Sequence, residues 1–322
     1  MKKKILITGG YGFIGSFAVQ KYLNMGHEVL NIDKLTYASD LTRLKNYNNL
    51  RNYRFIKADI KDQKIEKKIL RYDPDIIINF AAETHVDNSI SKPSKFVETN
   101  INGTYNLLNI SLKLFKRKKL KKDKFRFIQI STDEVFGTTK RGAKFNEKSP
   151  YKPNSPYSSS KASADLLVRS WNKTYGLPTI ITYCTNNFGP KQDKEKFIPT
   201  ILNNLKENKK IPIYGSGKNM REWIFVKDHV EYIYYISFLK NYQNNYFISD
   251  GNLVQNIDLV KKIIFLSNKI YSKDRKFKNC VKFVKDRLGH DFCYTLKRSK
   301  YLRKNKFSNF NKNLSLTIKS YL

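Results

Sequence analysis

Two residues of this sequence, Tyr157 and Lys161, could together remove a proton from an alcohol. They are four residues apart on a predicted helix and therefore share one face. A phenol, whose pKa is ordinarily about 10, is a poor base at neutral pH, but a neighbouring ammonium group and a positively charged cofactor ring would both lower that pKa. The tyrosine could then take the proton of a sugar hydroxyl while hydride leaves the same carbon. The alternative is an ordinary surface pair, and the position of the pair just after Ser155-Pro156 favours the chemical interpretation.

Two adjacent carboxylates, Asp133 and Glu134, follow a predicted strand that ends at Ile130. Carboxyl groups that share a cleft push their pKa values apart, which leaves one protonated and one ionised. An elimination of water needs that combination, because a base must take a C–H proton while an acid protonates the departing hydroxyl. An Asp-Glu pair in a loop can also be merely solvated, so this prediction depends on the surrounding motif, Ser131-Thr132-Asp133-Glu134-Val135-Phe136-Gly137.

A glycine-rich turn near the N-terminus could hold the phosphates of a dinucleotide. Gly9, Gly12 and Gly15 lie three residues apart in Thr8-Gly9-Gly10-Tyr11-Gly12-Phe13-Ile14-Gly15, between a predicted strand and a predicted helix. Glycines let the backbone approach a pyrophosphate at a helix N-terminus, where the helix dipole favours anions. Asp33 closes the next strand, and a carboxylate there binds a ribose and repels a 2′-phosphate. The pattern predicts NAD rather than NADP as the cofactor.

Alternating strands and helices must position these groups. Apolar runs predict strands and longer amphipathic stretches predict the helices between them. The predicted strands cover residues 4–8, 29–32, 55–57, 76–80, 125–130 and 179–183, and the predicted helices cover 13–25, 61–70, 95–115 and 157–175. Strands separated by helices indicate an α/β fold with a doubly wound, Rossmann-type parallel sheet. Ligands of such a sheet bind at its carboxyl edge, where the residues described above are expected.

The regular alternation is lost after the sixth strand, as turn residues become frequent. We therefore predict an NAD-binding Rossmann domain over residues 1–183 and a smaller, mixed α/β domain over residues 184–322, which would bind the substrate. The chain is expected to return to the first domain around residues 223–249.

The composition is that of a folded protein with a large positive charge. The 322 residues are 40% hydrophobic and 14% aromatic, which is sufficient for a packed core. With 62 basic and 27 acidic residues, the net charge is +35. Such a charge could indicate nucleic-acid binding, but it is spread along the chain, and its densest run, residues 116–122, is typical of a solvated loop. We expect no nucleic-acid partner.

Cysteine and histidine usage indicates a cytoplasmic protein without a metal site. Cys184, Cys280 and Cys293 form no paired framework and no C-x-x-C motif, as in proteins with reduced thiols. The four histidines include no H-x-x-x-H pattern, so no metal is expected. No segment approaches the roughly 20 apolar residues of a membrane span, so we expect no membrane partner.

The motifs, taken together, resemble one family. The chain resembles the extended short-chain dehydrogenase/reductase superfamily and, within it, the dTDP-glucose 4,6-dehydratases. The likeness is carried by residues 8–16, 33–38, 79–87, 99–104, 131–137, 157–161, 186–190, 195–199, 214–223 and 286–291. The Thr132-Asp133-Glu134 segment is specific to the dehydratases, whereas the glycine turn and the Tyr-x-x-x-Lys pair are shared with epimerases, reductases and decarboxylases.

The resemblance implies a role for each catalytic residue. Thr132 would hydrogen-bond the 4-oxygen of the sugar, and Tyr157, assisted by Lys161, would be the base for oxidation at C4. Glu134 would remove the C5 proton, and Asp133 would protonate the C6 hydroxyl as it leaves. The hydride would return to C6, so NAD would act as a bound catalyst.

The resemblance also implies two sets of binding residues and a homodimer. The cofactor set is Gly9, Gly12, Phe13, Ile14, Gly15, Asp33, Lys34, Thr36, Asp59, Ile60, Ala81, Ala82, Thr99 and Asn187, with Tyr157 and Lys161. The substrate set is Thr84, His85, Thr132, Asn186, Lys196, Phe197, Arg221, Asn256, Asp286, Arg287 and His290. Cys293 stands where the family commonly has an arginine, so a charge contact with the substrate would be missing there. The dimer would form through the helices 95–115 and 157–175.

The implied reaction is a hydro-lyase step of deoxysugar and rhamnose biosynthesis, which converts dTDP-glucose to dTDP-4-dehydro-6-deoxyglucose. The alternatives are a 4,6-dehydratase of UDP- or CDP-glucose and a nucleotide-sugar 4-epimerase. A third alternative is a cofactor-binding protein that binds nucleic acid and has lost catalysis, against which the intact catalytic set argues.

Overall fold

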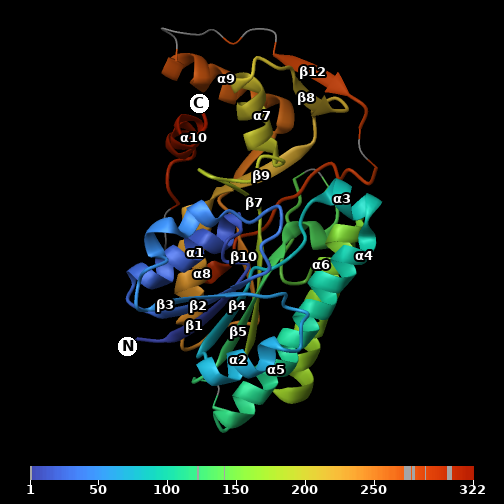
Figure 1. Cartoon of the computed structure of the whole chain (residues 1–322). Helices are drawn as coiled ribbons and strands as arrows, with labels where there is room; N and C mark the ends of the chain where they lie inside the picture. The colour runs from blue at the N-terminus through green and yellow to red at the C-terminus, as the bar shows by residue number, and fades with distance from the viewer. Residues whose placement is uncertain are drawn as a thin grey trace.

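A sheet of seven parallel strands forms the centre of the larger part of the molecule (Figure 1). The computed structural model describes residues 2–121, 123–140, 142–271, 277, 280–286, 288–302 and 307–322. The strand order is β10 (Asn245–Ile248), β6 (Thr179–Cys184), β5 (Arg126–Thr132), β4 (Ile76–Asn79), β1 (Lys4–Thr8), β2 (Glu28–Asp33) and β3 (Tyr53–Lys57). The chain runs outward from β1 in both directions, which is the doubly wound arrangement predicted from the sequence.

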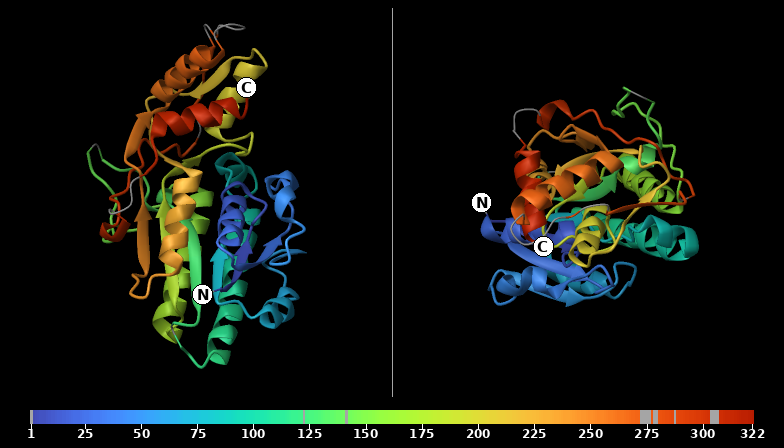
Figure 2. Two further views of the ribbon diagram at one scale, coloured as in Figure 1. Left: turned by 90° about the vertical axis from the view of Figure 1, so that its left-hand side faces the viewer. Right: turned by 90° about the horizontal axis from the view of Figure 1, so that it is seen from above.

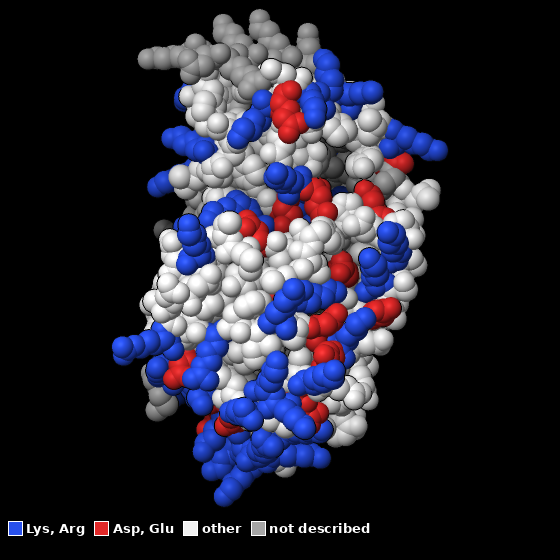
Figure 3. Space-filling model, in the orientation of Figure 1, with Lys and Arg blue, Asp and Glu red and all other residues white. Residues whose placement is uncertain are grey.

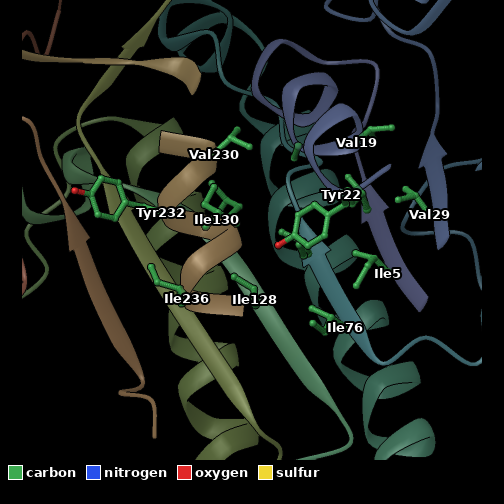
Figure 4. Close-up of a cluster of buried hydrophobic side chains, with 14 of the residues drawn as sticks. Ile5, Val19, Tyr22, Val29, Ile76, Ile128, Ile130, Val230, Tyr232 and Ile236 are labelled. Atoms are coloured by element: carbon green, nitrogen blue, oxygen red, sulfur yellow. The ribbon is translucent and has the colours of Figure 1, made fainter. Parts of the chain in front are cut away.

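Helices cover both faces of this sheet because successive strand residues point to opposite sides. On β1, Ile5 and Ile7 belong to one buried cluster and Leu6 to another. The first cluster lies under α1 (Phe13–Asn24) and α8 (Val226–Ser237), as the side chains in Figure 4 show. The second lies under α2 (Ile65–Tyr72), α5 (Gly103–Arg117) and α6 (Pro156–Tyr175). Ile5, Leu6 and Ile7 are all apolar, as is typical of a parallel strand that is buried on both faces.

The smaller part of the molecule stands on the carboxyl end of the sheet (Figures 1 and 2). It contains a three-stranded sheet in the order β11 (Asn252–Gln255), β9 (Met220–Phe225), β7 (Asn186–Phe188), and a two-stranded sheet of β12 (Val281–Val284) and β8 (Ile211–Tyr214). The helices α7 (Phe197–Lys206), α9 (Asn256–Tyr271) and α10 (Phe310–Lys319) pack on these strands and form a third buried cluster.

The chain crosses between the two parts more than once. Trp223, on β9, pairs with Asn186 and Asn252 in the three-stranded sheet. From Val226 onward, α8 packs beside α1, and β10 then pairs with β6 at the edge of the large sheet. The return of the chain to the large sheet therefore begins after the strand that contains Trp223.

Arg43 connects the two parts at the glycine turn. Its buried guanidinium donates hydrogen bonds to the carbonyls of Tyr11 and Ala38 on one side, and to the carbonyl of Lys191 and the carboxylate of Asp193 on the other. The distance to Asp193 is 2.7 Å. The guanidinium thus holds the segment 191–193 against the turn that follows β1.

Two helices differ from their predicted bounds. The helix predicted from residue 61 begins at Ile65, because Asp59 and Asp62 accept hydrogen bonds from the backbone N–H groups of Lys61 and Lys64 and so form turns instead. The helix predicted over 95–115 is three segments, α4 (Pro93–Phe96), a π-helical segment (Val97–Asn102) and α5. Two short helices, α3 (Val86–Ser91) and the one at 41–47, were not predicted.

The positive charge is densest away from the smaller part. On the face shown in Figure 3, Lys and Arg side chains crowd the end of the molecule where α5 leads into β5, and acidic side chains lie beside the hollow between the two parts. Among the described residues, no helix has the length and apolar character needed to cross a bilayer.

Candidate active site

A cavity of about 510 Å³ lies between the carboxyl edge of the large sheet and the smaller part. Most of the residues predicted from the sequence line it. They are Gly9, Gly12, Phe13, Ile14, Gly15, Ala82, Thr84, His85, Thr132, Glu134, Tyr157, Lys161, Asn186, Asn187, Lys196, Phe197, Arg221, Asn256 and His290. The glycine turn, the residues after β5 and the start of α6 therefore share one space.

The end of β5 positions the carboxylate pair through a tight turn. Thr132 is the N-cap of a 3-10 helix (Asp133–Phe136), and its side-chain oxygen accepts a hydrogen bond from the N–H of Glu134. The Thr132 hydroxyl also donates to Oδ1 of Asp133, at 3.2 Å. Glu134 lines the cavity, whereas Asp133 is only 1% exposed and lies outside its lining. Thr132 is thus the group that connects Asp133 to the cavity.

The pKa of the Asp133 carboxyl group is strongly perturbed by its surroundings. Burial raises its pKa well above the ordinary range, and the negative charge of Glu134 raises it further. Its second oxygen, Oδ2, has no hydrogen-bond partner among the described residues. A raised pKa favours the protonated form of this carboxyl group, which could then serve as an acid beside Glu134.

The helix α6 places Tyr157 and Lys161 in the same cavity. Ser155 caps the helix in a capping box with Ser158, Pro156 occupies its first position, and Gly176 ends it in the left-handed conformation. Tyr157 therefore lies in the first turn, directly at the sheet edge. One turn later the ammonium group of Lys161 donates to the carbonyl of Ile130, at 2.7 Å.

The expectation that Lys161 lowers the pKa of Tyr157 is wrong for the protein alone. Burial raises the pKa of Tyr157 well above its ordinary value, and the charge of Glu134 adds to this effect, while hydrogen bonding by Thr132 opposes it. Burial also lowers the pKa of Lys161. Burial, with the charge of Glu134 in addition, therefore favours the neutral phenol form of Tyr157.

Backbone atoms lie close to the glycines of the turn that follows β1. Gly9 has a φ of +70°, and a Cβ atom added there would lie 2.8 Å from the nitrogen of Ala81. A Cβ at Gly15 would lie 2.2 Å from the carbonyl oxygen of Gly9. Gly12 is the N-cap of α1 and makes no side-chain hydrogen bond. The backbone N–H groups of the first turn therefore have no side-chain partner at this cap. This arrangement is suited to a phosphate.

Several predicted cofactor residues do not line the main cavity. Asp33 already accepts hydrogen bonds from the N–H groups of Tyr11 and Leu35 and from the hydroxyl of Ser39, which leaves about one of its four acceptor sites for a ribose. Ile60 is a core residue, and Ala81 packs against the glycine turn. These side chains shape the turn rather than face the cavity.

Lys34, Thr36 and Thr99 line a second cavity of about 470 Å³. The ammonium group of Lys34 donates to Thr99, at 3.1 Å, and lies 3.3 Å from a carboxylate oxygen of Glu83 and 3.8 Å from one of Asp59. The lysine thus closes off the space between the loops that follow β2, β3 and β4. The residues predicted for the cofactor are therefore divided between two neighbouring spaces.

The predicted substrate residues lie on both sides of the main cavity. Lys196, at the start of α7, donates to the carbonyl and the hydroxyl of Thr84, each at 3.2 Å, and so spans the cavity. Arg221 is buried and donates to the carbonyls of Met220, Asp291 and Phe292, which fixes its guanidinium beside the cavity.

Two substrate predictions fall away from the cavity. Asp286 does not line it and accepts a hydrogen bond from Nδ1 of His290, a lining residue, at 2.6 Å. Arg287 lies outside the described residues. Cys293 is buried, with its carbonyl bonded to Thr139, and does not itself line the cavity.

Some cavity residues were not predicted from the sequence. Tyr294 lines the cavity, stacks on Arg221 and donates to the carboxylate of Asp291. His229 is fully buried, and burial lowers its pKa to about 3, so its neutral ring bonds Oδ1 of Asn187 at 2.9 Å and orients that amide. Neither residue belongs to a local motif, and only the fold brings Tyr294 to the cavity and His229 to the lining residue Asn187. Within the described parts of the chain, no three His, Cys, Asp or Glu side chains are grouped so as to hold a metal ion.

Comparisons with known proteins agree with this geometry. A family model described as GDP-mannose 4,6 dehydratase matches residues 6–305. The dTDP-glucose 4,6-dehydratase of Salmonella typhimurium is 43% identical over 312 residues, which cover 93% of this chain and 86% of that protein. A probable dTDP-glucose 4,6-dehydratase of Sinorhizobium fredii is 41% identical, with coverage of 92% and 85%.

A solved structure shows the same fold. The dTDP-glucose 4,6-dehydratase of Streptomyces venezuelae, determined with NAD bound, superposes with a TM-score of 0.89 at 35% identity and covers 99% of this chain and 96% of its own. Fold and site together define the class of extended short-chain dehydrogenases/reductases. Within that class, the chain belongs to the nucleotide-sugar 4,6-dehydratase family matched by the family model, among its dTDP-glucose 4,6-dehydratase members.

Proposed function

We propose that the protein is a hydro-lyase that converts dTDP-glucose to dTDP-4-dehydro-6-deoxyglucose, with NAD as its cofactor. The observation that carries this proposal is the buried Asp133, whose pKa is raised well above the ordinary range, next to Glu134, which lines the same cavity as Tyr157. A 4-epimerase needs a base and a cofactor but has no use for an acid next to a second carboxylate. The acid and base pair is what the loss of water requires.

The residues present fit NAD. A Cβ atom at Gly9 or Gly15 would lie too close to neighbouring backbone atoms, so the turn keeps its shape only with glycine at these positions. In this shape the turn can admit a pyrophosphate. Asp33 closes β2, and its carboxylate disfavours a 2′-phosphate, which supports NAD over NADP. When bound, NAD takes up and returns the hydride, and the positive charge of its ring favours the phenolate form of Tyr157.

The side chains divide the reaction between them. Tyr157 and Thr132 hold the 4-hydroxyl of the glucose, and Tyr157 takes its proton during oxidation at C4. Glu134 then removes the proton from C5, which the new 4-keto group acidifies. Asp133 gives its proton to the C6 hydroxyl, which leaves as water. Return of the hydride to C6, and of the proton from Glu134 to C5, then gives the saturated 4-keto-6-deoxy product. The nucleotide end of the substrate is held by Arg221, Lys196, Asn186, Asn256 and His290. The buried guanidinium of Arg221 supplies a fixed cation for it.

A comparison of sugar nucleotides tests the proposed function. The purified protein is incubated with dTDP-, UDP-, CDP- and GDP-glucose in the presence of NAD or NADP, and the 4-keto product is measured. We expect product from dTDP-glucose with NAD. A 4-epimer in place of a 4-keto sugar, or preferential turnover of UDP- or CDP-glucose, would replace the proposal with one of its alternatives.

We also propose a homodimer that forms through α5 and α6. The two helices pack side by side along one flank of the molecule (Figures 1 and 2). Large apolar side chains stand exposed on them, including Tyr105, Leu166 at 54% exposure and Tyr175. Tyr105 and Trp171 join the two helices edge to face. A second copy related by a two-fold axis would bury this surface.

Leu166→Glu should convert the dimer to a monomer in light scattering at micromolar concentration, because it places a charge in the proposed interface. Phe265→Glu is the matched control, since Phe265 is 67% exposed on α9 in the smaller part, and it should leave the mass unchanged. A wild-type protein of monomeric mass would contradict the proposal.

We propose that residues 1–183 bind NAD and that residues 184–322 bind the nucleotide sugar, apart from the stretch that returns to the large sheet. We also propose a cytoplasmic location, which the three free thiols of Cys184, Cys280 and Cys293 support.

A further inference from the structure

A polar stripe on α6 begins at the buried sheet edge and ends at the exposed Arg169. Tyr157, Lys161, Asp165 and Arg169 follow one another at intervals of four residues and therefore line one face of the helix. The charges along this face alternate, with Asp165 between two cations. Asp165 is completely buried, and the catalytic scheme above gives it no task.

Asp165 and Lys161 tie α6 to consecutive residues of β5. The Lys161 ammonium group donates to the carbonyl of Ile130 at 2.7 Å, and the hydroxyl of Ser131 donates to Oδ2 of Asp165 at 2.5 Å. The hydroxyl of Tyr151 lies 3.4 Å from the same oxygen. Oδ1 of Asp165 has no hydrogen-bond partner among the described residues, so the carboxylate is only partly satisfied by hydrogen bonds.

We propose that Asp165 is a positioning residue for the dehydratase reaction. Its carboxylate is the internal counterion of Lys161 and keeps the lysine charged. The carboxylate also holds α6 in register with β5, so that Tyr157 contacts the sugar at the sheet edge. This inference rests on the proposed function, because it gives Lys161 its assigned role beside Tyr157.

The electrostatic surroundings support this assignment. The groups that face Asp165 are Lys161 and Arg169 from α6, Ser131 from β5, Tyr183 from β6 and Tyr151 from the loop before α6. Burial raises the pKa of Asp165 to about 6, and the charge of Lys161 is the largest effect that opposes it. Burial lowers the pKa of Lys161, and the charge of Asp165 is the largest effect that restores it. Each charge therefore depends on the other.

Asp165→Asn tests the proposal because it keeps the shape and the bond to Ser131 but removes the charge. Opposite charges about one helical turn apart shift each other by about one to two pKa units. We expect the alkaline limb of the kcat profile with dTDP-glucose to move to lower pH by about that amount, while KM measured below the limb stays near the wild-type value. Asp165→Glu, which restores the charge, should bring the limb back toward its original position.

Tyr151→Phe is the matched control. It removes a hydroxyl that contacts Asp165 but leaves the charge, and Tyr151 does not line the cavity. Its alkaline limb should coincide with that of the wild type. A folded Asp165→Asn protein with an unshifted limb, or an equal shift in Tyr151→Phe, would overturn the proposal.

A thermal measurement decides the charge state of Asp165 even if dTDP-glucose is not the substrate. A carboxyl group whose folded pKa is raised from 3.8 to about 6 contributes stability below its ordinary pKa, and that stability is lost as the pH rises through about 6. The asparagine variant suffers no such loss. Its Tm relative to the wild type should therefore rise between about pH 4 and pH 6 and level off above. A constant difference across this range would contradict a buried, titrating carboxylate.

Discussion

Glu134→Gln should oxidise bound dTDP-glucose but form the 4-keto-6-deoxy product about 10²–10⁴-fold more slowly than the wild type, which is the usual contribution of a positioned general base. Oxidation at C4 uses Tyr157, whereas removal of the C5 proton needs the carboxylate, and an amide of the same shape cannot accept that proton. The absorbance of the reduced cofactor should therefore build up in this variant. Stopped-flow absorbance and product analysis measure the two stages separately.

Two further variants complete this experiment. Tyr157→Phe should suppress both the absorbance and the product, because it lacks the base for the first stage. Glu147→Gln is the control for the Glu-to-Gln change, since Glu147 is exposed and does not line the cavity, and it should behave as the wild type. Turnover of Glu134→Gln at the wild-type rate would refute the acid and base assignment and would favour the epimerase alternative.

Gly15→Ala should weaken catalysis with NAD by about 10²-fold, the typical cost of a displacement of about 1 Å in a reactive group. The added Cβ atom would lie 2.2 Å from the carbonyl oxygen of Gly9, so the turn that receives the pyrophosphate has to move. NAD affinity by fluorescence titration and steady-state turnover both report this change, and circular dichroism verifies the fold.

The control for this substitution is Gly26→Ala. Gly26 has a φ of +81° but no atom within 4 Å of an added Cβ, so the alanine introduces backbone strain without crowding. It should lower the free energy of unfolding by about 1–2 kcal/mol while NAD affinity stays the same. Unchanged affinity in Gly15→Ala as well would show that the turn does not approach the cofactor.

The sequence predicted the central sheet well because local signals determine it. Apolar runs such as Ile76–Asn79 are bounded by turns, and strands alternating with helices restrict the topology to few arrangements. The cavity residues on strand ends were predicted for the same reason, since the carboxyl ends of parallel strands meet at one edge. Thr132, Glu134, Tyr157 and Lys161 do line one cavity there.

Properties that depend on packing could not be predicted. The sequence places Asp133 next to Glu134, but only the folded structure buries it behind Thr132 and raises its pKa. The effect of Lys161 on the pKa of Tyr157 was misjudged because burial, which no spacing reveals, outweighs the charge of a lysine that is itself bound to Ile130. The π-helical segment (Val97–Asn102) was not predicted either, because its residues keep the pattern of an ordinary helix. Tyr294 reaches the cavity, and His229 reaches the lining residue Asn187, from distant parts of the chain.

Arg43 affects how the molecule opens under native conditions. Its buried guanidinium bonds the glycine turn and the segment 191–193 at once, so separation of the two parts would break its hydrogen bonds to Lys191 and its ion pair with Asp193. Fluctuations that detach the smaller part alone are therefore suppressed relative to unfolding of the whole chain. Amide protons of β8 and of β1, although they belong to different sheets, should then exchange with solvent in the same cooperative event.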